Sequence, residues 1–174
     1  MTEIWGTLTV RRGTVRDADT MLALFDDAVR WLTERGRTGQ WGTAPFSAIP
    51  QRVQQVRGWA EAGALRVAER DGLTLAVSSV GPAPAYVSPA TEPELYVMGL
   101  VGRRTPDARG AGAALLADAR AEAVRLGLKK VRVDCWAGGG GALVQYYVRA
   151  GFTPVESVQV EAWQGQVLEL RVDQ

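Results

Sequence analysis

The chain has 174 residues, a length typical of one domain whose core needs no metal or disulfide to support it. Its 20 basic and 19 acidic residues leave a formal net charge of +1, and neither sign gathers in one half. This balance argues against nucleic acid or an anionic membrane as a partner. Histidine is absent, which excludes Ser-His-Asp and Cys-His catalysis and histidine-ligated metal sites. The single cysteine, Cys135, cannot form an internal disulfide or a thiolate metal cage, so we expect no metal cofactor.

Targeting signals are not visible in the sequence. The segment from Met1 to Val10 has neither a basic start nor a continuous apolar block, so it does not resemble a signal peptide. No apolar run approaches the about 18 residues that span a bilayer. We therefore predict a cytoplasmic protein without a membrane partner. Lysine occurs only at Lys129 and Lys130, and together with the many alanines this use of arginine indicates a GC-rich bacterial coding bias.

The first half of the chain predicts two helices between strands. Thr14 and Asp17 resemble a capping box with Asp in the place of Glu, and apolar residues then recur at three- and four-residue spacing until Gly36. The elements expected here are a strand over 8–12, an amphipathic helix over 18–32, a polar loop over 37–45 and a shorter helix from Pro50 to Gly63.

The second half predicts an alternation of strands and helices. The expected strands cover 65–69, 73–80, 95–101, 131–136, 152–160 and 167–172, and the expected helices cover 110–126 and 142–150. The sequence Arg70-Asp71-Gly72 is typical of a hairpin turn, and Gly127 of a helix C-terminal cap. We therefore predict an α/β (α+β) fold in one domain spanning residues 1–174, with its core over about 8–172.

The segment 100–116 joins a strand to a helix through small residues. The first N–H groups of a helix lack partners, and the helix dipole adds positive potential there. Gly110 and Gly112 would let a phosphate approach these groups closely, and Arg109 adds a positive charge. A tight turn with alanines chosen for packing is the alternative. Leu115 breaks the dinucleotide fingerprint and no lysine completes a P-loop, so both common nucleotide motifs fail.

The sequence resembles the GNAT superfamily of N-acetyltransferases in two linked motifs. Gly110-x-Gly112 followed by Leu115-Leu116 fits the spacing of the family's pyrophosphate-binding turn, and Tyr147-x-x-x-Gly151-Phe152 fits the ending of its last helix. The element order agrees from about Leu8 to the C-terminus. The resemblance implies a central, mixed, mostly antiparallel twisted sheet of about six or seven strands with helices on both faces.

The resemblance also implies that acetyl-CoA is the cosubstrate. The residues that it assigns to the coenzyme are Leu100, Val101, Gly102, Asp107, Ala108, Arg109, Gly110, Ala111, Gly112, Ala113 and Tyr147. Two positions depart from the family pattern. Asp107 stands where the family has Gln or Arg, which puts a negative charge beside the pyrophosphate. Gly140 stands where the family often has Asn, which removes a capping side chain.

Acetyl transfer to an amine requires stabilisation of the carbonyl oxygen and protonation of the leaving sulfur. The resemblance implies that a backbone N–H near Leu100 or Val101 stabilises the oxygen and that Tyr147, rather than the neighbouring Tyr146, protonates the sulfur. A phenol with a pKa of about 10 carries the required proton at neutral pH. The alternative for Tyr147 is an aromatic residue that only packs in the core.

A base is also needed, because the attacking amine must be neutral. Glu94 shares one face of its expected strand with Tyr96 and Met98, so it is our first candidate. Glu92 in the preceding loop is the second candidate, and a chain of water molecules is a third route. Glu94 is otherwise a solvated carboxylate at the start of a strand.

Two of the six tryptophans are candidates for the acceptor site. The resemblance places Trp41, in the loop after the first helix, and Trp163, in the turn before the last strand, beside the acceptor pocket. An aromatic wall suits a hydrophobic amine or a cation over a ring face. Packing is the better interpretation for Trp31 and Trp59, and Cys135 is interpreted as a buried structural thiol.

These features predict an acetyl-CoA-dependent N-acetyltransferase that acts on a small-molecule amine by direct transfer in a ternary complex. The alternative is a non-catalytic acyl-CoA-binding module, motivated by Asp107, Gly140 and the uncertain base. A nucleotide-binding α/β protein is a third reading of the same turn. The expected partner is the amine substrate, and a homodimer is left open.

Overall fold

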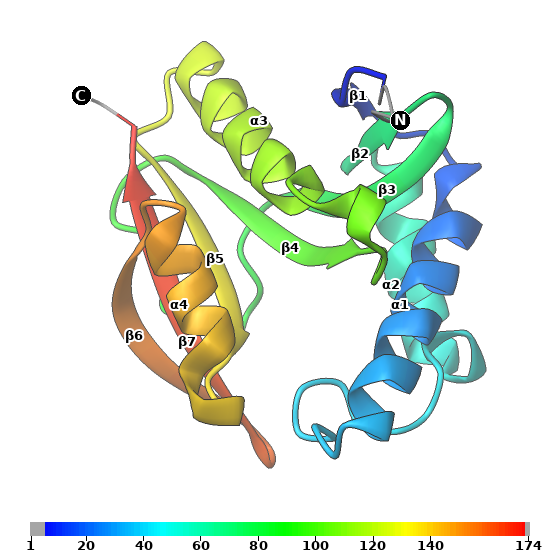
Figure 1. Ribbon diagram of the computed structural model, residues 1–174. Helices are drawn as coiled ribbons and strands as arrows, with labels where there is room; N and C mark the ends of the chain where they lie inside the picture. The colour runs from blue at the N-terminus through cyan, green and yellow to red at the C-terminus, as the bar shows by residue number, and fades with distance from the viewer. Residues whose placement is uncertain (1–5, 173–174) are drawn as a thin grey trace.

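Seven strands form one mixed sheet in the order β1-β2-β3-β4-β5-β7-β6 (Figure 1). The computed structural model describes residues 6–172, so the ends of the predicted domain and half of the segment from Met1 to Val10 lie outside the described residues. The strands are β1 (Thr9–Arg12), β2 (Leu65–Arg70), β3 (Leu73–Gly81), β4 (Glu94–Gly102), β5 (Lys130–Trp136), β6 (Thr153–Val160) and β7 (Trp163–Arg171). The helices are α1 (Asp17–Glu34), α2 (Pro50–Glu61), α3 (Ala111–Arg125) and α4 (Ala142–Arg149), with short 3-10 turns η1 (Phe46–Ala48), η2 (Pro106–Ala108) and η3 (Gly139–Gly141).

Among the described strands, β4 and β5 run parallel, and the other neighbouring pairs are antiparallel. Helix α3 connects the two parallel strands, as a parallel connection requires. The predicted mixed, mostly antiparallel sheet is therefore confirmed. None of the described helices combines the length and the apolar character needed to cross a membrane.

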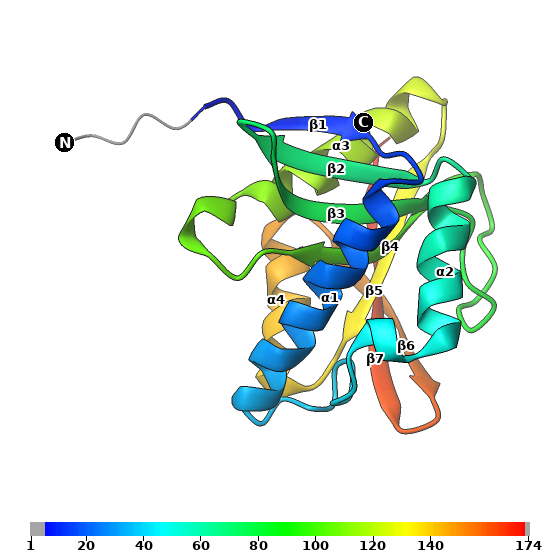
Figure 2. The same cartoon turned by 90° about the vertical axis from the view of Figure 1, so that its right-hand side faces the viewer.

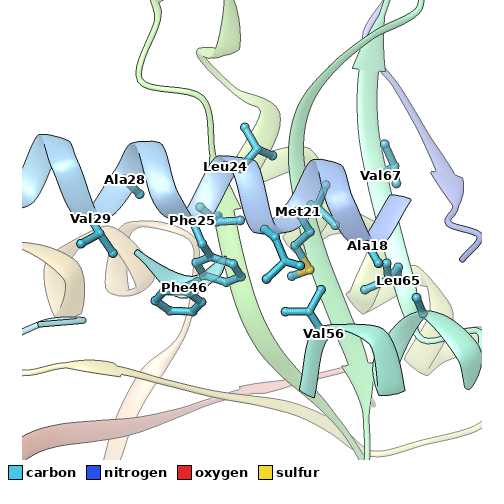
Figure 3. Packing of buried hydrophobic residues seen from close by; sticks show 14 residues of the cluster. Ala18, Met21, Leu24, Phe25, Ala28, Val29, Phe46, Val56, Leu65 and Val67 are labelled. Atoms are coloured by element: carbon cyan, nitrogen blue, oxygen red, sulfur yellow. The ribbon is translucent and has the colours of Figure 1, made fainter. Parts of the chain in front are cut away.

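Helices cover both faces of the sheet, as predicted. Helices α1 and α2 lie on one face and α3 and α4 on the other (Figures 1 and 2). On the first face, Met21, Phe25 and Ala28 of α1 pack toward the sheet at the spacing of one helical stripe (Figure 3). They meet Val56 of α2 and Val67 of β2, and the burial of these apolar groups fixes the helix pair on the sheet.

The opposite face has a second core beneath α3 and α4. Ala119 and Ala123 of α3 are buried, and their small side chains bring the helix close to the sheet. Val131 and Val133 of β5 point into the same cluster, so Arg132, which lies between them, points to the other face. Tyr147 of α4 completes this core.

Local turn signals account for most element boundaries. Asp71 and Gly72 have φ values of 52° and 77°, which confirms the two-residue hairpin turn between β2 and β3. The prediction for the last strand is too short, because β7 begins at Trp163 and not at residue 167. Glu161, with φ 53°, makes the tight turn instead. Gly165 and its flanking glutamines weaken the strand pattern of the sequence there. The pairing of Trp163 with Val160 of β6 nevertheless extends β7 back to Trp163.

Only half of the predicted capping box of α1 forms, because the Asp17 N–H donates to the Thr14 carbonyl, at 3.0 Å, and not to the Thr14 hydroxyl. Asp17 Oδ2 accepts a hydrogen bond of 2.7 Å from the Thr14 N–H, and the Thr14 hydroxyl accepts one of 3.3 Å from the Arg16 N–H. The two Asp17 oxygens also accept bonds of 2.9 and 3.0 Å from Arg11 of β1. The hydrogen bond from Arg11 is the main cause that holds the pKa of Asp17 below its usual value of 3.8.

Asp17→Asn should lower the free energy of unfolding by about 1–2 kcal/mol at neutral pH, because it weakens the hydrogen bonds that Asp17 accepts from the Thr14 N–H and from the charged Arg11. Since the folded-state pKa is depressed, this stabilisation is present above the ordinary Asp pKa and is lost as the pH falls through the folded value. The free energies of unfolding of variant and wild type, measured with urea, should therefore become equal in acid. Asp19→Asn, in the same first turn, is the control and should stay near wild type. A difference that does not depend on pH would contradict this account.

Candidate functional site

The strands β4 and β5 pair over four residues and then separate (Figure 1). Their register joins Glu94–Val97 to Lys130–Val133, so the rest of β4 is hydrogen-bonded only toward β3. The edge of β4 from Met98 onward thus faces an opening in the sheet. Backbone groups along such an edge are available to a ligand.

A β-bulge lies in β4 beside this opening. Met98 pairs with Ser79 and Val101 with Val77, so two residues of β4, Gly99 and Leu100, stand opposite one residue of β3. Gly99 has a φ of 65°, and a Cβ there would lie 2.8 Å from the Trp59 ring. Glycine is therefore required at the bulge. The predicted oxyanion donor near Leu100 or Val101 falls at this irregularity.

The N-terminus of α3 has unused N–H groups, as the sequence predicts. Gly110 adopts a left-handed conformation with φ 87°, and no side chain caps the helix. Ala114 makes the first bond within the helix, to the Gly110 carbonyl, at 2.9 Å. Within residues 6–172 no acceptor bonds to the N–H groups of residues 111–113. This arrangement fits an anion.

The side chains around this turn are arranged to leave its N–H groups open. The carboxylate of Asp107 accepts a hydrogen bond from the Thr105 hydroxyl, and Arg70 donates to the Asp107 carbonyl at 2.7 Å. The first contact fixes the turn from within, and the second ties it to β2. Arg109 is exposed, and Ala108 packs against the core below α3. Gly102 pairs with Ala76 at the end of β4 and leads into the turn.

Tyr147 lies in the core below α3 and α4, with 5% of its surface exposed. Its ring makes edge contacts with Tyr146 and Phe152, at centroid distances of 5.3 and 5.8 Å. Its hydroxyl has no hydrogen-bond partner in the described part of the chain, yet no fully buried side-chain oxygen there lacks one. The oxygen is therefore accessible. Burial raises the pKa of Tyr147, so the phenol keeps its proton at neutral pH.

Tyr146 lies nearer to the predicted phosphate turn than expected. A Cβ added to Gly112 would lie 2.5 Å from the Tyr146 hydroxyl oxygen, so this glycine accommodates a tyrosine of α4. Gly110, by contrast, has open space where a Cβ would be. At the start of α4, Gly140 and Gly141 are left-handed and no side chain caps the helix, in agreement with the missing Asn.

Glu94, the first candidate for the base, forms an ion pair with Arg132. Its two carboxylate oxygens accept hydrogen bonds of 2.5 and 2.6 Å from Arg132 of β5. Only 9% of the Glu94 side chain and 5% of the Arg132 side chain are exposed. Arg132 also donates to the Ser88 carbonyl at 2.9 Å. One guanidinium thus binds both oxygens of this carboxylate.

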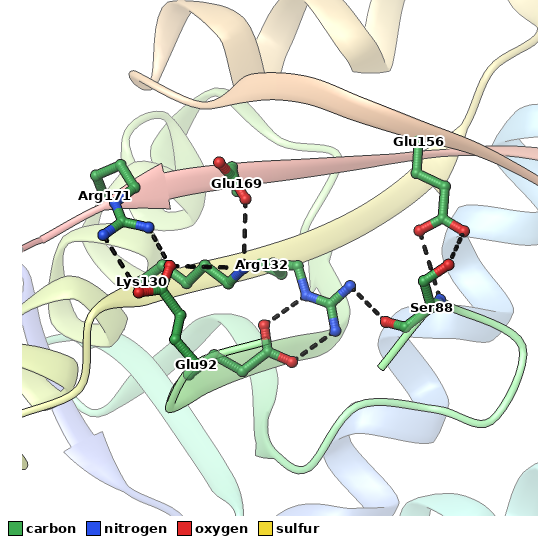
Figure 4. A network of polar contacts seen from close by, with 8 residues as sticks. Ser88, Glu92, Lys130, Arg132, Glu156, Glu169 and Arg171 are labelled. Atoms are coloured by element: carbon green, nitrogen blue, oxygen red, sulfur yellow. Dashed lines mark hydrogen bonds and ion pairs between the residues drawn. The ribbon is translucent and has the colours of Figure 1, made fainter. Parts of the chain in front are cut away.

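Glu92 is occupied in the same way. It contacts Arg171 of β7 and lies 3.9 Å from the Lys130 Nζ, which is also 3.5 Å from Glu169 (Figure 4). Both predicted carboxylates therefore bind basic groups of neighbouring strands.

Asp134 of β5 is the carboxylate that sequence reasoning missed. Its Oδ2 accepts hydrogen bonds from the hydroxyls of Tyr96, at 2.5 Å, and Tyr86, at 2.9 Å. Burial raises the pKa of Asp134, although the two hydroxyls act in the opposite direction. The sequence signal that could have identified Asp134 is a charged residue between the apolar residues Val133 and Cys135 of a central strand.

The two tryptophans assigned to the acceptor lie in different surroundings. The Trp163 Nε1 donates to the Gln40 carbonyl at 3.1 Å, and its ring meets Tyr86 at 6.3 Å. The loop after α1 thus lies against the start of β7. Trp41, however, packs on Phe25, 5.1 Å between ring centroids, at the edge of the α1 core.

Residues 6–172 contain no cluster of three residues able to hold a metal ion. Cys135 is buried, and burial raises the pKa of its thiol to about 12, which fits a structural role.

Comparison with known proteins identifies the fold. No family model matches the sequence, and no curated protein matches it either. A GNAT-family acetyltransferase from Listeria monocytogenes superposes with a TM-score of 0.68 at 18% identity over 94% of both chains. The yncA protein of Salmonella typhimurium, determined with its cofactor acetyl-CoA, gives 0.67 at 17% identity over 97% of this chain and 96% of that one. The Drosophila melanogaster polyamine N-acetyltransferase, which forms N-acetylagmatine, gives 0.67 at 17% identity over 95% and 100%. The chain has the GNAT fold.

Glu94→Ala should lower the free energy of unfolding by about 3–5 kcal/mol, because it leaves the Arg132 charge buried without its partner. Replacing both residues, as Glu94→Leu with Arg132→Met, should restore much of the loss. Asp27→Ala, which breaks an exposed ion pair with Arg30, is the control and should cost under about 1 kcal/mol. Denaturant unfolding measures all three. Equal small losses for Glu94→Ala and Asp27→Ala would show that the buried pair is not structural.

Proposed function

We propose that the protein is an acetyl-CoA-dependent N-acetyltransferase that acetylates a small-molecule amine by direct transfer in a ternary complex. The observation that carries this proposal is the opening between β4 and β5, with a bulge on one strand and the accessible Tyr147 hydroxyl at the same core. A thioester placed there meets backbone donors and a proton donor together. The GNAT fold of the structural neighbours supports the same chemistry.

The residues present fit the coenzyme. A pyrophosphate is an anion, and α3 offers uncapped N–H groups behind a left-handed Gly110. Asp107, whose charge opposes an anion, is bonded to Thr105 within its own turn. The residues proposed to hold the coenzyme are Leu100, Val101, Gly102, Asp107, Ala108, Arg109, Gly110, Ala111, Gly112, Ala113 and Tyr147.

The chain contributes positioning and proton transfer. Acetyl-CoA supplies the acetyl group as an activated thioester. A backbone N–H at the bulge, near Leu100 or Val101, would donate to the carbonyl oxygen as it becomes negative. Tyr147 would give its phenolic proton to the departing sulfur. The raised pKa of this phenol ensures that the proton is present.

A small amine is the proposed acceptor. The fold neighbour from Drosophila melanogaster acts on such a compound, agmatine, which carries a primary amine. Trp163 and Tyr86 present aromatic rings beside the opening, as a cationic or hydrophobic amine would require. Trp41 is proposed to act at the rim, through the loop that Trp163 contacts.

The coenzyme turn is tested by calorimetry with acetyl-CoA. Gly112→Ala should weaken binding by about tenfold or more, because its methyl group enters the phosphate site and displaces Tyr146. Gly58→Ala in α2, where a Cβ meets nothing within 4 Å, is the matched helical control and should bind as wild type does.

The double variant Gly112→Ala with Tyr146→Phe separates the two effects. It removes the hydroxyl oxygen that the methyl group would clash with, so the protein can pack normally. Affinity that stays low supports a phosphate site at Gly112. Affinity that recovers fully would show that only the tyrosine had been disturbed.

Tyr147→Phe should reduce kcat for acetyl transfer by about 10²- to 10⁴-fold while leaving acetyl-CoA affinity unchanged. The ring and its packing remain, and only the accessible hydroxyl is lost. Tyr146→Phe is the control and should retain the transfer rate. Assays with labelled acetyl-CoA and an amine panel provide the measurement. A Tyr147→Phe enzyme as fast as wild type would remove the proton donor from the proposal, and coenzyme binding without turnover in wild type would favour the non-catalytic module.

A further inference from the structure

Asp134 has one carboxylate oxygen without a partner. Both phenols, Tyr86 and Tyr96, donate to Oδ2, and nothing in the described part of the chain donates to Oδ1. Since no fully buried side-chain oxygen there lacks a partner, Oδ1 is accessible. A carboxylate oriented by two hydroxyls through one oxygen therefore presents the other to its surroundings.

Among residues 6–172, no basic side chain pairs with this carboxylate. Arg132 is the nearest basic group along β5, but its guanidinium binds Glu94 and the Ser88 carbonyl. The positive charge of Arg52 in α2 lowers the pKa of Tyr86 rather than that of Asp134. The Arg52 guanidinium lies over the Phe46 ring, with 4.6 Å from its Cζ to the ring centroid. The other titratable groups that interact with Asp134 are Tyr96, Cys135 and Tyr147, which carry no positive charge. A cation is the missing complement.

Asp134 lies where the opening in the sheet begins. It is the first residue of β5 after the register with β4 ends at Val133. Its neighbours Val133 and Cys135 point into the core that holds Tyr147, so Asp134 points to the other face, where Tyr96 lies. Tyr147 and Asp134 thus lie on opposite faces of the sheet.

We propose that Asp134 binds the ammonium group of the acceptor through Oδ1 and takes its proton, which makes it the base of the reaction. This inference rests on the proposed acetyl transfer. The acceptor class that fits is an aliphatic primary amine, delivered as a cation past the rings of Tyr86 and Trp163.

The proton balance of the step is complete. Asp134 removes one proton from the ammonium nitrogen, whose lone pair forms the C–N bond to the acetyl carbon. The C–S bond breaks, and the thiolate takes the proton of Tyr147. The nitrogen's second proton restores the phenol, and Asp134 releases its own to solvent. Ammonium and acetyl-CoA thus give amide, free thiol and one proton.

The central test is Asp134→Asn, whose amide oxygen can still accept both tyrosine hydroxyls. We expect kcat to fall by about 10²- to 10⁴-fold at neutral pH and to recover in part at high pH, where the amine loses its proton unaided. Acetyl-CoA affinity and the free energy of unfolding should not fall, since an uncompensated charge is removed. Asp26→Asn, which also keeps two hydrogen bonds, to Ser47, is the matched control.

Tyr86→Phe tests the positioning of the carboxylate. Its hydroxyl lowers the pKa of Asp134, so its loss should move the acid limb of the pH–rate profile to higher pH. An Asp134→Asn enzyme with the wild-type rate and pH profile would overturn the inference. So would lower stability of Asp134→Asn with an unchanged profile, because that pattern belongs to a structural residue.

A binding measurement separates this inference from the proposed function. With aspartate labelled at its carboxyl carbon, the ¹³C resonance that Asp134→Asn deletes should shift when agmatine is added to the protein without coenzyme. A shift in a protein that neither binds acetyl-CoA nor transfers acetyl would uphold the amine site and refute the transferase. The opposite result is acetyl transfer by the wild type, no agmatine-induced shift and a fully active Asp134→Asn variant. It would uphold the transferase and refute the role of Asp134.

Discussion

The parting of β4 from β5 is the constraint on which the rest of the structure depends. A parallel pair normally satisfies the backbone of both strands along its length, and an interruption inside a sheet exposes polar groups that must find other partners. Here the pairing ends at Val97 and Val133, in the middle of a seven-stranded sheet. The bulge at Gly99 bends β4 away and is compatible only with glycine. From Met98 onward, the side of β4 that faces β5 thus has backbone groups that can bind a ligand.

Alternate side chains of β5 point to opposite faces of the sheet. On β5, Val133 and Cys135 point to the core of α3 and α4, whereas Asp134 points to the opposite face. The phenol proposed to give a proton and the carboxylate proposed to take one therefore lie on opposite faces of the sheet. Burial raises the pKa of both, which keeps Tyr147 protonated and makes Asp134 a stronger base than an exposed aspartate.

Local signals made much of this architecture predictable. Helix periodicity, the Asp71–Gly72 turn and the glycines before α3 act over a few residues, and the structure agrees with them. The site carboxylates depend on distant partners instead. Glu94 meets Arg132 at a separation of 38 residues, and Tyr86 meets Asp134 at 48. Sequence position alone cannot distinguish a carboxylate held by a buried guanidinium from one held by two phenols. The separation of β4 from β5 was likewise invisible, apart from one glycine inside a strand.

The ion pairs of Glu94 and Glu92 also help to position Asp134. Arg132 joins Glu94 to the Ser88 carbonyl, and Ser88 also donates to Glu156 of β6, so the loop between β3 and β4 is fastened on both sides (Figure 4). This loop carries Tyr86. Because the loop is fixed, the Tyr86 hydroxyl is held against Asp134 Oδ2 and Oδ1 remains the accessible oxygen. A carboxylate oriented in this way loses little freedom when a cation arrives, which is the energetic advantage of a preorganised site.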